Sequence, residues 1–433
     1  MFLAEIIKNK NIIFGHRDLN VSILVIFGLL YLPHAFKTFP SSWSLDFYQF
    51  WAVGHRINEF DRPLIYSEVF QKSVGEKLVK LAEESGSKRE LNDANGRKNY
   101  IEFAGTPFLY TVFSWLPSGE YDFDYSIYHS LSLTLFLLGI FLFLYFASIP
   151  FILGPLVLMI LTDLSLPFYS DSCGTNTNQL QLGLISIFLL LRLNKRKKWV
   201  NTISAFFLGL LFYFKPNIIF SVVFLFAFWF FSSSKTELIE VSCGFLIATI
   251  FVFVYSGLYL RDLACWFGWG ANFMRIIQNK FYLEKSFLGW LGIFPKPETS
   301  WILGIMALCP VIAGIVFNRT KFKSLENLFI PDIHYCEFLL FGLGLLVYIL
   351  TAQMVHDHYF VLTFMPTLAL LSIRPLSAPK NRIEIWTKSI LVGFSIILIN
   401  YTVNITRYFG TLVLYGCSLW VFLKKFKPHR IKI

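Results

Sequence analysis

One carboxylate, Asp46, stands out because of its neighbours. It lies in the stretch SLDFYQFW, residues 44–51, where most flanking side chains are aromatic or apolar. Such surroundings keep water away from a carboxylate and raise its affinity for a proton, as a general base requires. Aromatic residues also gather at membrane–water interfaces, where an acid among them has no special role. The sequence leaves both interpretations open.

A second group of candidates follows in SDSCGTNTNQLQLG, residues 170–183. This run opens an apolar segment and offers Asp171, Asn176, Asn178 and Gln179 as hydrogen-bond partners. Side-chain amides both donate and accept, which suits the hydroxyl groups of a sugar. Any single Asn or Thr at this position also serves as an ordinary helix cap. We take the cluster as a candidate sugar or acceptor site, together with Tyr48 and Glu102.

Lys215 lies between two apolar segments in FYFKPNIIF, residues 212–220, and Pro216 follows it. A lysine in this position extends its amine towards the membrane surface, while a proline interrupts or bends the helix. Ionisable residues within membrane segments are functional more often than not. An anionic ligand such as a phosphate would account for Lys215.

The stretch TAQMVHDHYF, residues 351–360, places His356 and His358 on either side of Asp357. Two such histidines are compatible with a metal site, but no further Cys, His or acidic cluster at ligand spacing accompanies them. We therefore expect no metal here, and a phosphate or hydroxyl partner instead. Arg261 is a further candidate for a phosphate contact, or else a solvated cation.

The composition is that of a polytopic membrane protein. Of the 433 residues, 55% are hydrophobic and 15% are charged, which is too apolar for a soluble globular domain. The formal charge of +11 does not indicate nucleic-acid binding, because basic clusters beside apolar segments set membrane topology. The six cysteines form no CxxC pair, and their apolar surroundings predict neither a disulfide framework nor a metal site.

About a dozen apolar segments predict an all-α protein with about 12 transmembrane helices. Three basic clusters (residues 192–199, 318–323 and 424–433) then fall on the same side as the N-terminus. Because cytoplasmic loops retain Lys and Arg, both termini are expected in the cytoplasm. The N-terminal segment is expected to be a retained first span, since no small-residue cleavage site follows it. The expected spans lie near residues 21–36, 126–147, 149–169, 179–193, 200–214, 217–231, 241–259, 301–317, 336–353, 359–373, 385–401 and 409–423.

This topology predicts two large extracytoplasmic loops, residues 37–125 and 260–300. In the first loop, apolar residues at helical spacing over residues 66–84 predict an amphipathic helix on the membrane surface. Residues 85–99 are polar and rich in turn formers, which predicts a crossing loop. Residues 104–117 are too short to span and are expected to be re-entrant or interfacial. The candidate polar residues all fall on the extracytoplasmic side.

The order of these motifs resembles a known family. An acid after the first span, TPF and SWLP at residues 106–117, NTNQLQLG at 176–183, FKPN at 214–217 and HDHY at 356–359 resemble glycosyltransferase family 87. That family contains polyprenol-phosphate-mannose-dependent mannosyltransferases of the GT-C superfamily. The resemblance covers about residues 15–375 and implies that Asp46 is the catalytic base. The Lys-Pro and late His positions of the family correspond to Lys215, Pro216 and His358.

The resemblance implies a single GT-C domain over residues 1–433 in a bacterial plasma membrane. Its expected activity is inverting transfer of a hexose, with mannose favoured, from a polyprenyl-phosphate donor to a lipid or glycan acceptor on the extracytoplasmic face. Lys215, His356, His358 and Arg261 are the expected donor-phosphate contacts. No metal or other cofactor is required, because fixed cations can stabilise the leaving phosphate.

Two alternative functions stay open at the level of sequence. One is a transporter or flippase of a lipid-linked or small polar solute, which predicts acids deep in several spans and related halves. The other is a different GT-C activity, such as glucosyl, arabinosyl or aminoarabinose transfer or glycan ligation. The gathering of polar residues at one membrane face favours a transferase over a transporter.

Overall fold

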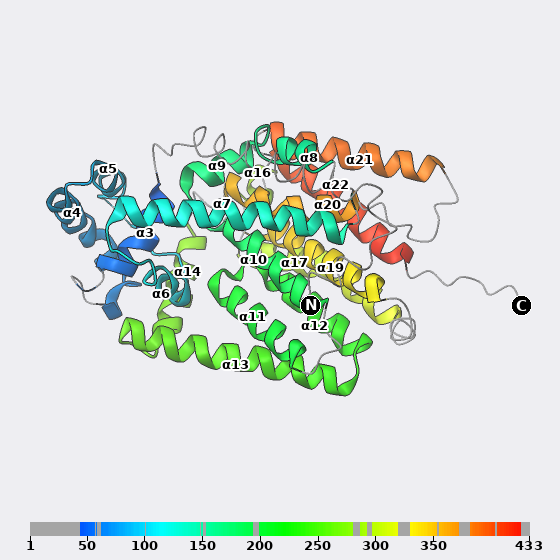
Figure 1. Ribbon diagram of the computed structural model, residues 1–433, viewed down its shortest axis with the longest axis horizontal. Coiled ribbons are helices and arrows are strands. Elements are labelled where there is room, and N and C mark those ends of the chain that lie inside the picture. Colours follow the sequence, from blue (N-terminus) through cyan, green and yellow to red (C-terminus); the bar gives the residue numbers. More distant parts are fainter. Residues whose placement is uncertain are drawn as a thin grey trace, which may run out of the picture.

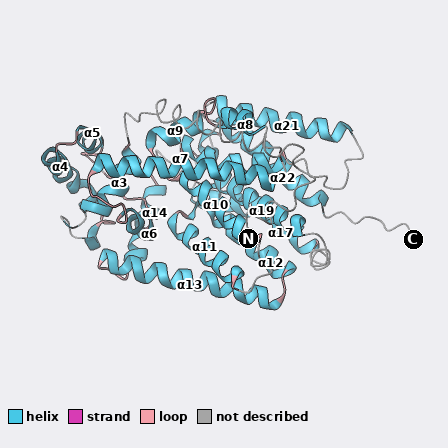
Figure 2. Cartoon of the chain, viewed as in Figure 1, coloured by secondary structure: helices cyan, strands magenta, loops and turns pink. Residues whose placement is uncertain are grey.

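The computed structural model describes residues 44–425 apart from 57, 59–61, 100, 148, 150–152, 194–198, 280–285, 292–296, 319–329, 353–354, 372–381 and 403–404. Over this part of the chain every regular element is a helix and no strand is present (Figure 2). The predicted first span and most of the three basic clusters lie outside the described residues. The predicted orientation of the termini therefore stays a prediction.

The long helices form a bundle along the longest axis of the molecule, and Figure 1 shows α13 along the lower edge and α21 along the upper edge. Within it, α7 packs on α10, α10 on α11, and α11 on α13, while α19 packs on α12 and α22. The bundle helices are α7 (Tyr121–Phe146), α10 (Asn178–Arg192), α11 (Val200–Phe214), α12 (Ile219–Ser232), α13 (Lys235–Leu260), α17 (Pro297–Phe317), α19 (Ile330–Thr351), α21 (Arg382–Tyr401) and α22 (Ile405–Lys425).

The described residues contain 3 helices long and apolar enough to cross a membrane, or up to 5 spans if each bent pair counts as one. The 3 are α7, α13 and the His334–Thr351 part of α19. Length and composition thus support a helical membrane protein. They do not confirm the predicted dozen spans, several of which are shorter or broken helices here.

Two broken helices bring polar residues to one place. The helices α8 (Gly154–Leu161) and α9 (Leu166–Gly174) meet at 68°, where a single span was predicted. The second break separates α11 from η5 (Pro216–Ile218) and α12, which bend by 119° at Lys215. Lys215 is extended at this break (φ −152°, ψ 106°), because the ring of Pro216 disfavours a helical conformation for the residue before it.

Short helices gather at one end of the bundle (Figure 1). They are α3 (Leu45–Trp51), the π-helical turn η1 (Ala52–Arg56), η3 (Arg62–Leu64), α4 (Glu68–Ser85), α5 (Lys88–Gly96), α6 (Pro107–Phe113) and α14 (Cys265–Ile277). The remaining short elements are α16 (Phe287–Trp290), η6 (Asp357–Thr363) and α20 (Phe364–Leu370). The helix predicted over residues 66–84 is confirmed as α4, which buries Val74 and Leu78.

The loop predicted over residues 85–99 is wrong, because most of it forms α5. Ser87 caps this helix, and its hydroxyl accepts a hydrogen bond of 3.0 Å from the backbone N–H of Glu90. A serine followed three residues later by a glutamate is a helix-start signal, which the polar composition concealed. The correction matters because Arg97, the residue that follows α5, belongs to the candidate site.

A buried ion pair stabilises the part of the bundle that lies far from the short helices. Arg192 of α10 donates to Glu337 of α19 at 2.8 Å, and both side chains are 0% exposed. Trp229 of α12 donates its indole N–H to the same carboxylate oxygen at 2.7 Å. Arg192 also reaches Glu237 of α13 at 3.0 Å. The cluster therefore joins four helices through charge-assisted hydrogen bonds.

Replacing Glu337 with leucine should destabilise the protein by about 3–5 kcal/mol, because Arg192 would keep a buried charge with its main partner removed. Thermal unfolding of the detergent-solubilised protein, followed by the loss of the monodisperse fraction, measures this effect. The matched control is Glu237→Gln, which removes the partly exposed partner of the same arginine. Equal stability of Glu337→Leu and the wild type would contradict the role assigned to this pair.

Candidate active site

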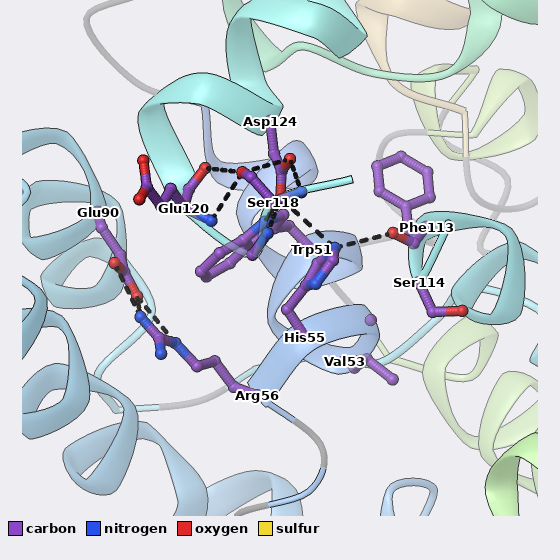
Figure 3. Close-up of polar contacts among 12 residues, drawn as sticks. Trp51, Val53, His55, Arg56, Glu90, Phe113, Ser114, Ser118, Glu120 and Asp124 are labelled. Atoms are coloured by element: carbon purple, nitrogen blue, oxygen red, sulfur yellow. Dashed lines mark hydrogen bonds and ion pairs between the residues drawn. The ribbon is translucent and has the colours of Figure 1, made fainter. Parts of the chain in front are cut away.

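The C-terminal end of α3 is fixed to the start of α7 (Figure 3). Trp51 donates its indole N–H to the buried Asp124 at 3.0 Å, and the backbone N–H of Gly119 donates to the same oxygen at 2.9 Å. In the π-helical turn, Nε2 of His55 lies 3.1 Å from the backbone oxygen of Phe113. These contacts hold α3 against α6 and α7.

The N-terminal end of α3 is held by α5. Asp93 accepts a hydrogen bond of 3.0 Å from the backbone N–H of Ser44, while Tyr121 donates to its other oxygen at 2.7 Å. One helical turn later, Arg97 donates to Oδ1 of Asp46 at 3.2 Å. Because α3 is anchored at both ends, the carboxylate in its first turn has a defined position.

Asn176 stands between the carboxylate of Asp46 and the ammonium group of Lys215. Its Nδ2 donates to Oδ2 of Asp46 at 2.8 Å, and its Oδ1 accepts from Nζ of Lys215 at 2.7 Å. Lys215 also donates to Oδ1 of Asn178 at 2.6 Å. The amide of Asn176 thus holds an acid through its nitrogen and a cation through its oxygen. Gly174 contributes space, since a Cβ there would lie 3.3 Å from Oδ2 of Asp46.

A buried layer supports these amides from behind. Asp171 accepts hydrogen bonds from Nδ2 of Asn178 at 2.8 Å and from the backbone N–H of Gln179 at 3.2 Å. The side chain of Gln179 donates to Ser172 at 2.7 Å. Asp171 is therefore positioned to orient Asn178, and through it Lys215.

His358 lies on the other side of Asn176. Its Nε2 lies 3.3 Å from Nδ2 of Asn176, so that nitrogen accepts and the proton of the neutral ring is on Nδ1. Burial lowers the pKa of His358 to about 3, which makes the ring neutral at pH 7. The ring of His356 stacks at 5.4 Å, and Asp357 between them pairs with Arg407 of α22 at 2.6 Å. This ion pair anchors the loop that carries both histidines.

Asp46 is ionised at neutral pH, so the expectation that its apolar neighbours raise its affinity for a proton is wrong. Burial opposes its charge, but the facing His358 ring and the Arg97 guanidinium outweigh burial and hold the pKa of Asp46 below its ordinary value. The N–H of Asn176 acts in the same direction. Because His358 is neutral at pH 7, Arg97 and Asn176 carry this effect there. The side chain of Asp46 is 20% exposed, so it is open to a ligand.

These groups line one cavity of about 950 Å³, a volume typical of a small-molecule site. Its lining has a polar part, with the charged and amide groups, and an apolar part. Six of the predicted site residues line it: Asp46, Glu102, Asn176, Lys215, His356 and His358. Candidate residues that lie far apart in the sequence therefore line one cavity.

The other predicted site residues lie elsewhere. Asn178, Asp171 and Gln179 stand behind the wall, as described above. Tyr48 is 0% exposed and packs edge-on against Tyr121 with ring centroids 5.7 Å apart, so it belongs to the core. Arg261 is exposed at the end of α13, where φ is 55°. Neither Tyr48 nor Arg261 is among the residues that line the cavity.

Arg97 and Gln49 also line the cavity, and the sequence did not identify them as candidates. Arg97 lay in the segment predicted as a loop, and its partner Asp46 is 51 residues away. Gln49 follows Asp46 by three residues, which places both on one face of a helix. Recognising that residues 45–51 form a helix would have identified Gln49 as a candidate.

No protein-family model, curated protein or solved structure matches this chain. The family resemblance therefore rests on the motifs of the sequence. Among the described residues, no group of three or more His, Cys, Asp or Glu side chains is arranged to hold a metal ion. The expectation that no metal is needed stays a prediction.

Replacing Arg97 with glutamine should raise the pKa of Asp46, because the variant lacks a nearby positive charge that favours the ionised carboxyl group. On acidification, the carboxylic acid band of Asp46 should then appear at higher pH than in the wild type. Infrared difference spectroscopy measures this band, which Asp46→Asn identifies by its loss. The control is Arg89→Gln in α5, the helix that precedes Arg97; the guanidinium of Arg89 lies over the ring of Tyr125. An unchanged titration in Arg97→Gln would contradict the assignment.

Proposed function

We propose that this protein is a membrane glycosyltransferase that uses a polyprenyl-phosphate sugar as its donor. The observation that carries the proposal is the placement of Asp46 and Lys215 on the two sides of the Asn176 amide. A transferase of this kind needs a base for the acceptor hydroxyl and a cation for the leaving phosphate, both close to the sugar. The polar part of the cavity lining supplies these two groups.

The apolar part of the cavity lining supports a lipid-linked donor. It is lined by Ile219, Phe220 and Val223 of α12 and by Gly304, Ile305 and Leu308 of α17. Ile219 is 42% exposed and Ile305 is 59% exposed, so these apolar side chains are accessible to a ligand. An isoprenoid chain bound between α12 and α17 would leave the cavity towards the bilayer, with its phosphate at the polar part of the lining.

The proposed reaction is a single displacement with inversion. The acceptor oxygen attacks the anomeric carbon of the sugar, the bond from that carbon to the phosphate oxygen breaks, and the electron pair stays on the phosphate. Asp46 takes the proton of the acceptor hydroxyl as the new bond forms. Lys215 compensates the charge that develops on the leaving phosphate. The low pKa of Asp46 keeps it ionised and ready to accept the proton.

His358 contributes a hydrogen bond and not a charge. Its Nε2 is occupied by Asn176, which leaves Nδ1–H as the donor available to a phosphate oxygen. Lys215 lies 4.8 Å from the ring of Tyr359, a contact that restricts its ammonium group to the cavity side. We propose a hexose, with mannose favoured by the family resemblance, and transfer on the extracytoplasmic face.

Replacing Asp46 with asparagine should reduce sugar transfer by a factor of about 10²–10⁴, because the amide cannot accept the proton. The assay follows transfer of a labelled sugar from polyprenyl phosphate in membranes that contain the wild type or the variant. The control is Asp122→Asn, which changes an exposed acid in the first turn of α7. Undiminished turnover in Asp46→Asn would rule out its role as the base.

A further inference from the structure

Gln49 presents an unused hydrogen-bonding group beside the proposed base. It lies one turn after Asp46 on α3, and both residues line the cavity. Its side chain is only 7% exposed, yet Oε1 has no hydrogen-bond partner within the described part of the chain. A buried polar atom without a partner costs free energy, so native structures seldom retain one without a reason.

Arg97 presents the complementary group in the same wall. Its Nη2 is engaged by Asp46 at 3.2 Å, whereas Nε is buried and has no hydrogen-bond partner among the described residues. The wall next to Asp46 therefore carries one unpaired acceptor, Oε1 of Gln49, and one unpaired donor, Nε–H of Arg97. A ligand with several hydroxyl groups satisfies both, because each hydroxyl can donate and accept.

An aromatic surface also lines the cavity. Trp269 and Phe273 of α14 both line it and stack with ring centroids 5.6 Å apart. The indole N–H of Trp269 donates to the backbone oxygen of Ala104 at 3.1 Å, so the orientation of the ring is fixed. The apolar C–H face of a pyranose packs well on such a ring, while its hydroxyl groups point sideways.

We infer that Gln49 and Arg97 form the binding site for a polyhydroxylated acceptor, a sugar or polyol headgroup, with one hydroxyl at Asp46 and its neighbours at Gln49 and Arg97. This inference rests on the proposed transferase activity and specifies its acceptor. A long-chain alcohol with a single hydroxyl leaves both polar groups unpaired. Sites built to bind hydroxyl groups discriminate strongly against ligands that lack them.

The test measures binding of methyl α-mannopyranoside to the full-length protein in lipid nanodiscs by saturation-transfer NMR. The variant is Gln49→Met, which keeps the size and shape of the side chain and removes its hydrogen bonds. We expect its affinity for the glycoside to fall about fivefold to tenfold, the effect of losing a buried hydrogen bond. The control is Gln278→Met, an exposed position at the end of α14.

Cyclohexylmethanol serves as a ligand of similar size with one hydroxyl. Its binding should be equal in Gln49→Met and the wild type, which would show that the cavity of the variant is intact. Equal binding of the glycoside to both proteins, or no binding to the wild type, would overturn the inference. Sugar transfer from polyprenyl phosphate is measured on the same preparations. Glycoside binding that depends on Gln49 without any transfer would support a binding site for a polyhydroxylated ligand and refute the proposed transferase.

Discussion

The candidate site depends on one constraint: an acid and a cation must lie close together without neutralising each other. A direct Asp46–Lys215 pair would occupy the oxygen that has to accept a proton and the ammonium group that has to meet a phosphate. Asn176 resolves this conflict, because its amide donates to Asp46 and accepts from Lys215. Both charges are held, and each keeps a side open to the cavity.

The surrounding structure determines the positions of Asn176 and of its two partners. Asn176 follows Thr175, which has φ of 49° and ends α9 in a left-handed conformation. Side chains other than glycine rarely adopt this conformation, and such residues are found most often where function requires a particular geometry. Lys215 arrives from the break before Pro216, and Asp46 from a short helix anchored at both ends. A left-handed residue, a helix break and a short anchored helix therefore bring three side chains together at the Asn176 amide.

The sequence predicted several candidate residues, but it did not predict the side chains that surround them. Asp46, Lys215 and His358 are ionisable residues in short stretches beside apolar or aromatic sequence. They could therefore be found without knowledge of the fold. Arg97 could not, because its role arises only when α5 folds back on α3. Tyr48 does not line the cavity, because neighbouring residues on a helix point in different directions and Tyr48 faces the core.

Topology was harder to predict because hydropathy reports segments and not their geometry. The apolar segment over residues 149–169 corresponds to parts of two helices that meet at 68°. Residues 85–99 have the composition of a loop, but a cap at Ser87 begins a helix there. Arg261 was assigned to a loop that reaches the site, whereas α13 carries it to an exposed end. In each case the position where a helix begins, breaks or ends decides where the side chain lies.

The most direct test of the account is the structure of the protein with a bound polyprenyl phosphate, determined by electron cryomicroscopy in nanodiscs. We expect the phosphate to contact Nζ of Lys215, with Nδ1 of His358 within hydrogen-bond distance. The isoprenoid chain should run between α12 and α17. A phosphate bound far from Lys215 and Asp46, with the cavity free of lipid, would contradict the proposed function and its assignment of the site.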